Sequence, residues 1–145
     1  MTANAEVLLV EDNPRDAELT IRAFKRNQLA DRLFHVKDGA EALDFLFQRG
    51  QHAGRQGEAL PRVILLDLKL PKMNGLEVLR RIKSDARLQT IPVVVVTSSA
   101  EDPDLEAAYE LGANSYVIKP VQFEAFMETM SKLGLYWLMA NHPLK

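Results

Sequence analysis

The chain has 145 residues, 47% of them hydrophobic, and a formal net charge of −2, which is the composition of one ordinary globular domain. This charge balance argues against a dedicated nucleic-acid binder, and the absence of an 18-residue apolar run and of a signal-peptide pattern leads us to expect a cytoplasmic protein that does not enter membranes. Cysteine is absent, which excludes disulfides and thiolate metal sites.

Short apolar runs alternate along the chain with longer segments in which apolar residues recur at a helical period. The runs at residues 7–10, 33–36, 63–66, 93–96 and 116–118 are predicted to be strands. Between them, spacings of three and four place apolar residues on one face of each of three helices. These are Ala17, Ile21 and Phe24; Leu43, Leu46 and Phe47; and Leu76, Leu79 and Ile82.

The second half of the chain continues the alternation. A fourth helix is predicted from about Pro103 to Leu111, with Gly112 as its C-terminal cap. A fifth helix is expected to bury Phe123, Phe126, Met127 and Met130. The connection at residues 48–61 carries three glycines and is expected to be a tolerant surface loop. Strands that alternate with helices predict a single doubly wound α/β domain with a five-stranded parallel sheet.

Polar residues follow the predicted strands, and in such a sheet the carboxyl ends of the strands share one edge where ligands bind. Glu11 and Asp12 follow the first strand, Asp67 follows the third, Thr97 the fourth and Lys119 the fifth. Carboxylates about 5 Å apart repel by roughly 3 kcal/mol per pair at an effective dielectric constant near 20. We therefore expect a cation among them.

The available ligands decide which cation fits. The histidines, His35, His52 and His142, lack metal-ligand spacing and are predicted to be ordinary surface or loop residues. An oxygen-only site favours Mg²⁺ or Mn²⁺ with room for a phosphoryl oxygen. Lys119 and the Thr97 hydroxyl would bind further phosphoryl oxygens, and a carboxylate would accept the phosphoryl group.

Four motifs close predicted strands in this order: V-E-D-N, L-L-D-L-K-L-P-K-M-N-G, V-V-V-V-T-S-S and Y-V-I-K-P. Together they resemble the receiver domain of two-component response regulators over residues 6–133. The resemblance implies a flavodoxin-like (βα)₅ fold with strand order 2-1-3-4-5. It also implies a phosphoacceptor signalling protein rather than an enzyme, in which Asp67 takes a phosphoryl group from a phosphohistidine of a sensor histidine kinase.

The resemblance assigns the metal ligands residue by residue. Asp12, Asp67 and the main-chain carbonyl of Lys69 would bind Mg²⁺, and Glu11 would assist through a water molecule. No organic cofactor is implied.

The resemblance further implies how phosphorylation changes the protein. Thr97 and Lys119 would contact the phosphoryl group, and Thr97 and Tyr116 would act as the switch that changes the surface of the fourth helix, fifth strand and fifth helix. The bond between Lys119 and Pro120 is expected to be cis.

The end of the chain carries a second prediction. A receiver domain uses nearly all 145 residues, which leaves no room for a DNA-binding domain, so we expect a stand-alone regulator that signals through protein contacts. An apolar helical extension is predicted at about residues 134–145, and one helix face cannot bury it all. We therefore expect a homodimer through this extension, the fourth and fifth helices and the fifth strand. A narrower match is to the small regulators that partner phytochrome-type kinases.

Other functions stay open at this stage. A Mg²⁺-dependent aspartyl-phosphate phosphohydrolase would also use Asp67 as its nucleophile, but haloacid-dehalogenase-like enzymes normally carry an aspartate where this chain has Lys69. A flavin carrier would share the sheet, but Glu11 and Asp12 would repel its phosphate. A degenerate receiver that acts only as a scaffold is disfavoured because every metal and phosphate position is filled.

Overall fold

The apolar runs form the strands of one parallel sheet in the computed structural model, which describes residues 5–142. The strands are β1 (Val7–Val10), β2 (Leu33–Val36), β3 (Val63–Leu66), β4 (Val93–Thr97) and β5 (Ser115–Ile118). They lie in the order β2-β1-β3-β4-β5, which confirms the predicted topology. β1, β3 and β4 are buried along their whole length because helices cover both faces of the sheet, which explains why they read as continuous apolar runs.

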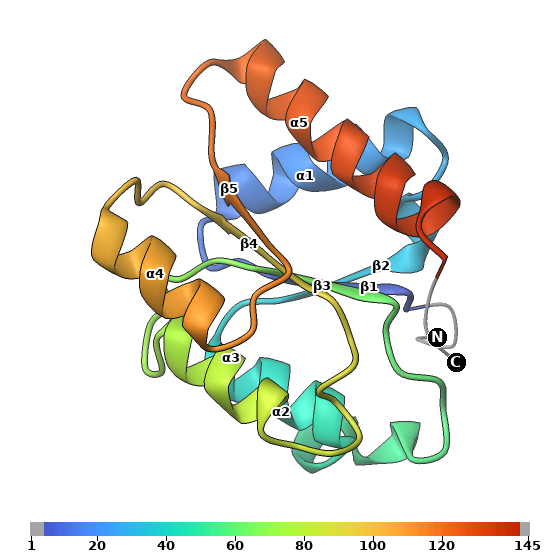
Figure 1. The fold of residues 1–145 in the computed structure, drawn as a ribbon. Helices are drawn as coiled ribbons and strands as arrows, with labels where there is room; N and C mark the ends of the chain where they lie inside the picture. The colour runs from blue at the N-terminus through green and yellow to red at the C-terminus, as the bar shows by residue number, and fades with distance from the viewer. Residues whose placement is uncertain (1–4, 143–145) are drawn as a thin grey trace.

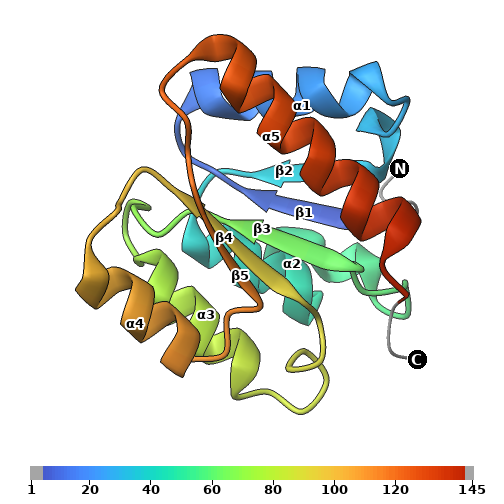
Figure 2. The same ribbon diagram turned by 45° about the horizontal axis from the view of Figure 1, so that its top comes forward.

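Five α-helices cover the two faces of the sheet. They are α1 (Pro14–Arg26), α2 (Gly39–Phe47), α3 (Gly75–Lys83), α4 (Asp102–Glu110) and α5 (Phe123–Leu135). Figures 1 and 2 show α1 and α5 side by side on one face and α2, α3 and α4 on the other. Each face has its own apolar cluster, one built around Phe24 and Met127 and the other around Phe45 and Ile82.

The helix ends follow local sequence signals. Asn13, Asp38 and Asn74 each cap the N-terminus of a helix by accepting a hydrogen bond from the backbone N–H three residues later. α4 ends one residue earlier than predicted, and Gly112 follows its cap with φ +106, a conformation that glycine adopts without strain. The predicted glycine stop is therefore confirmed.

The connection between α2 and β3 is more structured than predicted. It contains a short 3₁₀ helix (Gly50–Arg55), and a second one (Ala30–Arg32) precedes β2. Gln48 and Arg55 are buried, and the Arg55 guanidinium lies 3.8 Å from the centre of the Phe45 ring. Packing of these two long side chains ties the segment to α2, so the expectation of a tolerant surface loop is wrong for them.

The last described residues divide between core and surface. α5 continues as a π-helical turn (Tyr136–Ala140), in which Leu138 is buried against the α1–α5 cluster while Tyr136 and Met139 are exposed. Residues 143–145 of the predicted extension lie outside the described residues. Phe123, expected to be buried, is 39% exposed and belongs to neither apolar cluster, whereas Phe126, Met127 and Met130 are buried as expected. Among the described residues no helix is long and apolar enough to span a membrane.

Gly75 allows the start of α3 to lie directly against the end of β3. A Cβ atom at this position would collide with the Asp67 carbonyl oxygen and would lie 2.6 Å from the Leu68 Cα atom. We predict that Gly75→Ala lowers the free energy of unfolding by about 1 to 3 kcal/mol in urea denaturation, because backbone must move.

Gly54 provides the matched control, since a Cβ atom there would meet nothing within 4 Å. Gly54→Ala should leave stability unchanged or raise it by up to about 1 kcal/mol. Equal effects of the two substitutions would contradict the close approach at Gly75.

Candidate functional site

Hydrogen bonding of the sheet continues one residue past the strands and fixes the backbone of the site. The Glu11 N–H donates to the carbonyl of the last residue of β2 at 3.1 Å, and the Asp67 N–H donates to that of β1 at 3.1 Å. The Lys119 N–H donates to the carbonyl of the last residue of β4 at 2.8 Å. Three predicted site residues therefore stand at one edge on rigid backbone.

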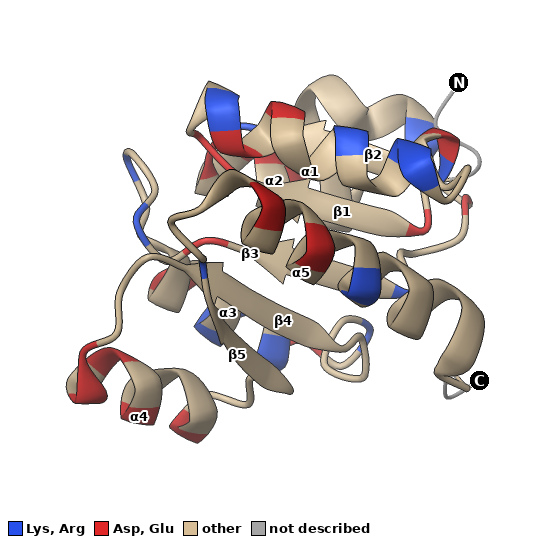
Figure 3. Ribbon diagram, turned by 90° about the horizontal axis from the view of Figure 1, so that it is seen from above, with Lys and Arg blue, Asp and Glu red and all other residues tan. Residues whose placement is uncertain are grey.

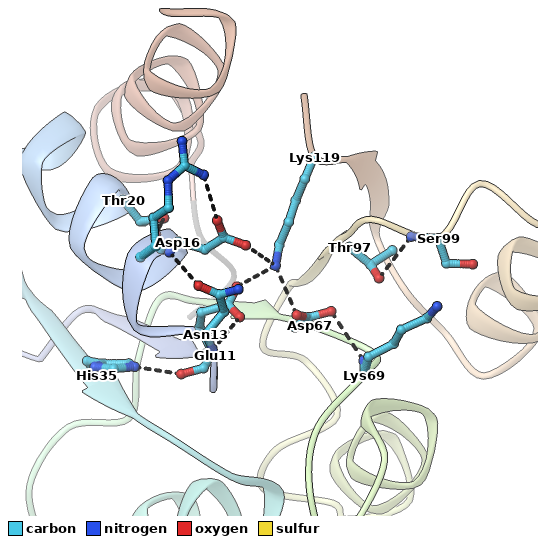
Figure 4. A network of polar contacts seen from close by, with 11 residues as sticks. Glu11, Asn13, Asp16, Thr20, His35, Asp67, Lys69, Thr97, Ser99 and Lys119 are labelled. Atoms are coloured by element: carbon cyan, nitrogen blue, oxygen red, sulfur yellow. Dashed lines mark hydrogen bonds and ion pairs between the residues drawn. The ribbon is translucent and has the colours of Figure 1, made fainter. Parts of the chain in front are cut away.

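The Lys119 ammonium group lies at the centre of the site (Figure 4). Its Nζ atom is 2.7 Å from Glu11 Oε1, 2.9 Å from Asp67 Oδ2 and 2.9 Å from Asp16 Oδ2. The four side chains are between 5% and 15% exposed, so water screens these contacts weakly. Sequence analysis missed Asp16, which stands in the first turn of α1, where an acidic residue already suits the helix dipole.

Glu11, Asp12 and Asp67 form the acidic cluster of the site. One carboxylate oxygen from each lies within 4.8 Å of the other two, with Glu11 and Asp67 buried and Asp12 exposed. The cluster offers only oxygen ligands, and one side opens to solvent. These residues fit Mg²⁺ or Mn²⁺, which take carboxylates and keep several waters.

Burial and neighbouring charges shift the pKa values of Glu11 and Lys119 in opposite directions. Burial raises the pKa of Glu11 to about 7, although its contact with Lys119 favours the ionised carboxylate. Burial alone would lower the pKa of Lys119, but its contacts with Glu11, Asp67 and Asp16 together raise that pKa above its usual value. Lys119 is therefore a fixed cation at neutral pH, whereas Glu11 can carry a proton.

A second group of contacts links β4 to α4 and β5. Thr97 is fully buried, and its hydroxyl oxygen accepts a hydrogen bond from the Ser99 N–H at 3.3 Å. The Ser99 hydroxyl donates to Asp104 in α4 at 2.5 Å. The Tyr116 hydroxyl donates to the Ser99 carbonyl at 2.9 Å, and burial raises the pKa of this half-buried tyrosine. The predicted switch residues Thr97 and Tyr116 therefore both contact Ser99.

Two further features of the site are a backbone hydrogen bond to Asp67 and the peptide bond before Pro120. The Lys69 backbone N–H donates to Asp67 Oδ1 at 3.2 Å, so both oxygens of Asp67 have a polar partner within the protein. The peptide bond between Lys119 and Pro120 is trans, so the expectation of a cis bond is wrong for this structure. Trans is the lower-energy isomer before proline by about 0.5 to 1 kcal/mol.

The histidines depart from the prediction of ordinary surface residues. His35 lies in β2, and its Nε2 atom is 2.7 Å from the Glu11 carbonyl oxygen, which can only accept the hydrogen bond. The His52 side chain is 11% exposed and packs edge-on against Phe34 and Phe45. His35 and His52 are therefore partly buried, whereas His142 is exposed as expected.

One edge of this doubly wound sheet presents an acidic cluster, a buried lysine and a strand-end hydroxyl. This combination defines a class of phosphoryl-binding signalling domains. The sequence model of the response regulator receiver domain matches residues 7–131. This chain belongs to that family, and so to the proteins of two-component signalling.

Known proteins are similar to the chain over most of its length. The probable methanogenesis regulatory protein FilR2 of Methanothrix harundinacea is 48% identical over 93% of this chain and 84% of its own length. Response regulator Rcp1 of Synechocystis sp. is 37% identical over 91% of this chain and 88% of its own.

Solved structures match the fold as well. The Mn²⁺-bound form of Rcp1 superimposes with a TM-score of 0.88 at 35% identity, covering 96% of this chain and 98% of its own. The phosphorylated cyanobacterial phytochrome response regulator RcpA gives the same TM-score and identity, covering 96% and 97%.

The raised pKa of Glu11 predicts how Mg²⁺ binding depends on pH. Because this pKa is about 7, the metal-free site holds a proton at pH 6 that Mg²⁺ must displace, whereas at pH 8 the carboxylate is free. Calorimetric titration should show the Mg²⁺ dissociation constant rising about tenfold from pH 8 to pH 6.

Glu11→Gln removes the titrating group and keeps the shape of the side chain. In this variant the dissociation constant should be higher at pH 8 and nearly constant down to pH 6. A wild-type affinity that does not change over this range would contradict the prediction.

Proposed function

We propose that the protein is a stand-alone response regulator that accepts a phosphoryl group on Asp67 from the phosphohistidine of a sensor histidine kinase. The observation that carries this proposal is the position of the Asp67 carboxylate, which lies 2.9 Å from the Lys119 ammonium and within the acidic cluster. Transfer of an anionic phosphoryl group needs cations on both sides of the accepting oxygen. This site supplies the Lys119 ammonium group and can hold a divalent cation.

The transfer uses the protein's own residues as follows. One Asp67 oxygen forms a bond to phosphorus while the phosphorus–nitrogen bond of the phosphohistidine breaks, and the imidazole leaves with the electron pair. Lys119 and the Thr97 hydroxyl bind phosphoryl oxygens as charge moves onto them. The rigid strand ends hold these groups in place before the donor arrives.

The proposed cation site consists of Asp12, Asp67 and the Lys69 carbonyl, with Glu11 acting through water. Support comes from the oxygen-only cluster and from the Mn²⁺-bound form of the similar protein Rcp1. When bound, Mg²⁺ would neutralise the crowded carboxylates and a phosphoryl oxygen.

The phosphohydrolase alternative is not favoured. Haloacid-dehalogenase-like phosphohydrolases normally carry an aspartate as general acid two residues after the nucleophile, and here Lys69 stands at that position with an exposed side chain. We therefore infer a phosphoacceptor rather than an enzyme, with at most self-phosphorylation from small donors and slow loss of the phosphate.

Phosphorylation would change the surface of α4, β5 and α5. Thr97 and Tyr116 both bind Ser99, whose hydroxyl reaches Asp104 at the start of α4. Movement of the Thr97 hydroxyl toward a phosphoryl group would disturb this set of contacts and shift α4, with Tyr116 following. Figure 3 shows acidic residues along α4 and no basic ones, so a downstream protein that docks there should be basic.

The partners are proposed from exposed surface and from relatives. Leu135, Tyr136 and Met139 are 42%, 52% and 64% exposed, and Tyr136 lines a groove of about 530 Å³ between the start of β5 and the end of α5. An apolar surface of this kind supports a homodimer through α4, β5, α5 and the C-terminal extension. The similarity to RcpA, a cyanobacterial phytochrome response regulator, supports a phytochrome-type kinase as donor. We further infer one receiver domain over residues 1–145, in the cytoplasm, with neither nucleic acid nor membrane as partner.

Phosphorylation at Asp67 can be tested by mass spectrometry after incubation with Mg²⁺ and acetyl phosphate. One phosphate should be found and mapped to Asp67 by borohydride reduction, and Asp67→Asn should take none. Asp31→Asn, at an exposed aspartate away from the site, should be phosphorylated like the wild type. Phosphate on another residue, or its persistence in Asp67→Asn, would refute the assignment.

Dimerisation can be tested by sedimentation at micromolar concentration. Leu138 is buried, so truncation of the extension would disturb the core, and the test uses Tyr136→Gln with Met139→Gln instead. We predict that this pair of substitutions weakens self-association at least about tenfold without lowering the unfolding midpoint. A wild-type protein that sediments only as monomer would count against the dimer.

A further inference from the structure

Asp16 is a partner of Lys119 that lies outside the four motifs of the site. It stands four residues after Asp12 in the first turn of α1, and its Oδ2 atom is 2.9 Å from Lys119 Nζ. Figure 4 shows Lys119 extended between Asp16 on one side and Asp67 on the other. The contact therefore joins the first helix to the end of the fifth strand, across 103 residues of sequence.

The position of Asp16 is fixed by its own backbone. Its N–H donates to the Asn13 side chain at 3.0 Å, and its carbonyl accepts from the Thr20 hydroxyl at 2.8 Å. The side chain is 15% exposed, and its second oxygen lies 3.9 Å from the Arg15 guanidinium. Asp16 therefore places beside Lys119 a carboxylate whose backbone is fixed in the first turn of α1.

The three carboxylates around Lys119 differ in whether they also belong to the acidic cluster. An ammonium group has three N–H donors, and here it has three carboxylate partners. Glu11 and Asp67 also belong to the acidic cluster, whereas Asp16 does not. When a cation and a phosphoryl group occupy the site, Glu11 and Asp67 must turn some of their oxygens to them, and Asp16 stays available to Lys119.

We propose that Asp16 is a positioning residue that holds the Lys119 ammonium in place for the phosphoryl group while Glu11 and Asp67 serve the cation and the transfer. This inference rests on the proposed function of Asp67. A free lysine side chain has considerable rotamer entropy, and a fixed ion pair removes that freedom before the donor binds.

The kinetic test compares Asp16→Asn with Glu18→Gln, which removes the same charge from an exposed residue of the same helix. With acetyl phosphate and saturating Mg²⁺, Asp16→Asn should be phosphorylated about tenfold more slowly than wild type, and Glu18→Gln within about twofold of it. The Mg²⁺ dissociation constants of all three proteins should agree within about threefold, because neither residue belongs to the acidic cluster.

A double-mutant cycle tests whether Asp16 acts through Lys119. In a Lys119→Met background, adding Asp16→Asn should not slow phosphorylation further. Wild-type phosphorylation rates in Asp16→Asn would overturn the proposal. So would an equal slowing by Glu18→Gln, or a further slowing in the Lys119→Met background, because each would assign the effect to net charge or to folding.

A second readout does not depend on phosphorylation. Spectra that detect lysine ¹⁵N ammonium groups should give a sharp Lys119 signal in the wild type, and this signal should broaden in Asp16→Asn while amide spectra of the rest stay unchanged. An unchanged ammonium signal would overturn the positioning role. If the wild type takes no phosphate on Asp67, the proposed function fails, and the ammonium spectra still decide whether Asp16 holds Lys119.

Discussion

The attraction between one buried ammonium group and a surplus of carboxylates governs this site. Lys119 contacts Glu11, Asp16 and Asp67, and Asp12 stands beside them, so the edge of the sheet keeps a net negative charge even with the lysine in place. Backbone hydrogen bonds that extend the sheet past the strand ends prevent these groups from moving apart. The fold therefore maintains a repulsion that a divalent cation relieves, and an added phosphoryl group becomes acceptable once that cation is present.

Much of this arrangement follows from the sequence because parallel sheets buried on both faces have a simple pattern. Apolar runs such as Val63–Leu66 can be read as strands, and the residue after each strand is then known to lie at the ligand-binding edge. The sequence alone therefore predicts that Glu11, Asp12, Asp67 and Lys119 lie together. Asp16 could not be predicted in this way, because an aspartate in the first turn of a helix already has a local explanation. Only the tertiary structure places its carboxylate against Lys119.

The other departures also arise from tertiary packing that local patterns do not record. Glycines in the α2–β3 connection favoured a loose loop, but the Gln48 side chain hydrogen-bonds to the backbone of this connection and the Arg55 guanidinium lies over the Phe45 ring of α2. Phe123 has the spacing of a core residue, yet it is the first residue of α5 and is exposed, and burial on this helix begins at Phe126. The apolar C-terminal segment divides at Leu138, which is buried while its neighbour Met139 is exposed, because the π-helical turn lets only one side face the α1–α5 cluster.

We propose that the carboxylates of separate strands gather around a divalent cation so that Asp67 can accept a phosphoryl group. A crystal structure of the protein grown with Mg²⁺ and beryllofluoride, a mimic of the phosphoryl group, tests it most directly. We expect the cation among Glu11, Asp12 and Asp67, beryllium on an Asp67 oxygen, and Lys119 bound to a fluoride while still paired with Asp16. A cation elsewhere, or an Asp67 without beryllofluoride at saturating concentrations, would contradict it.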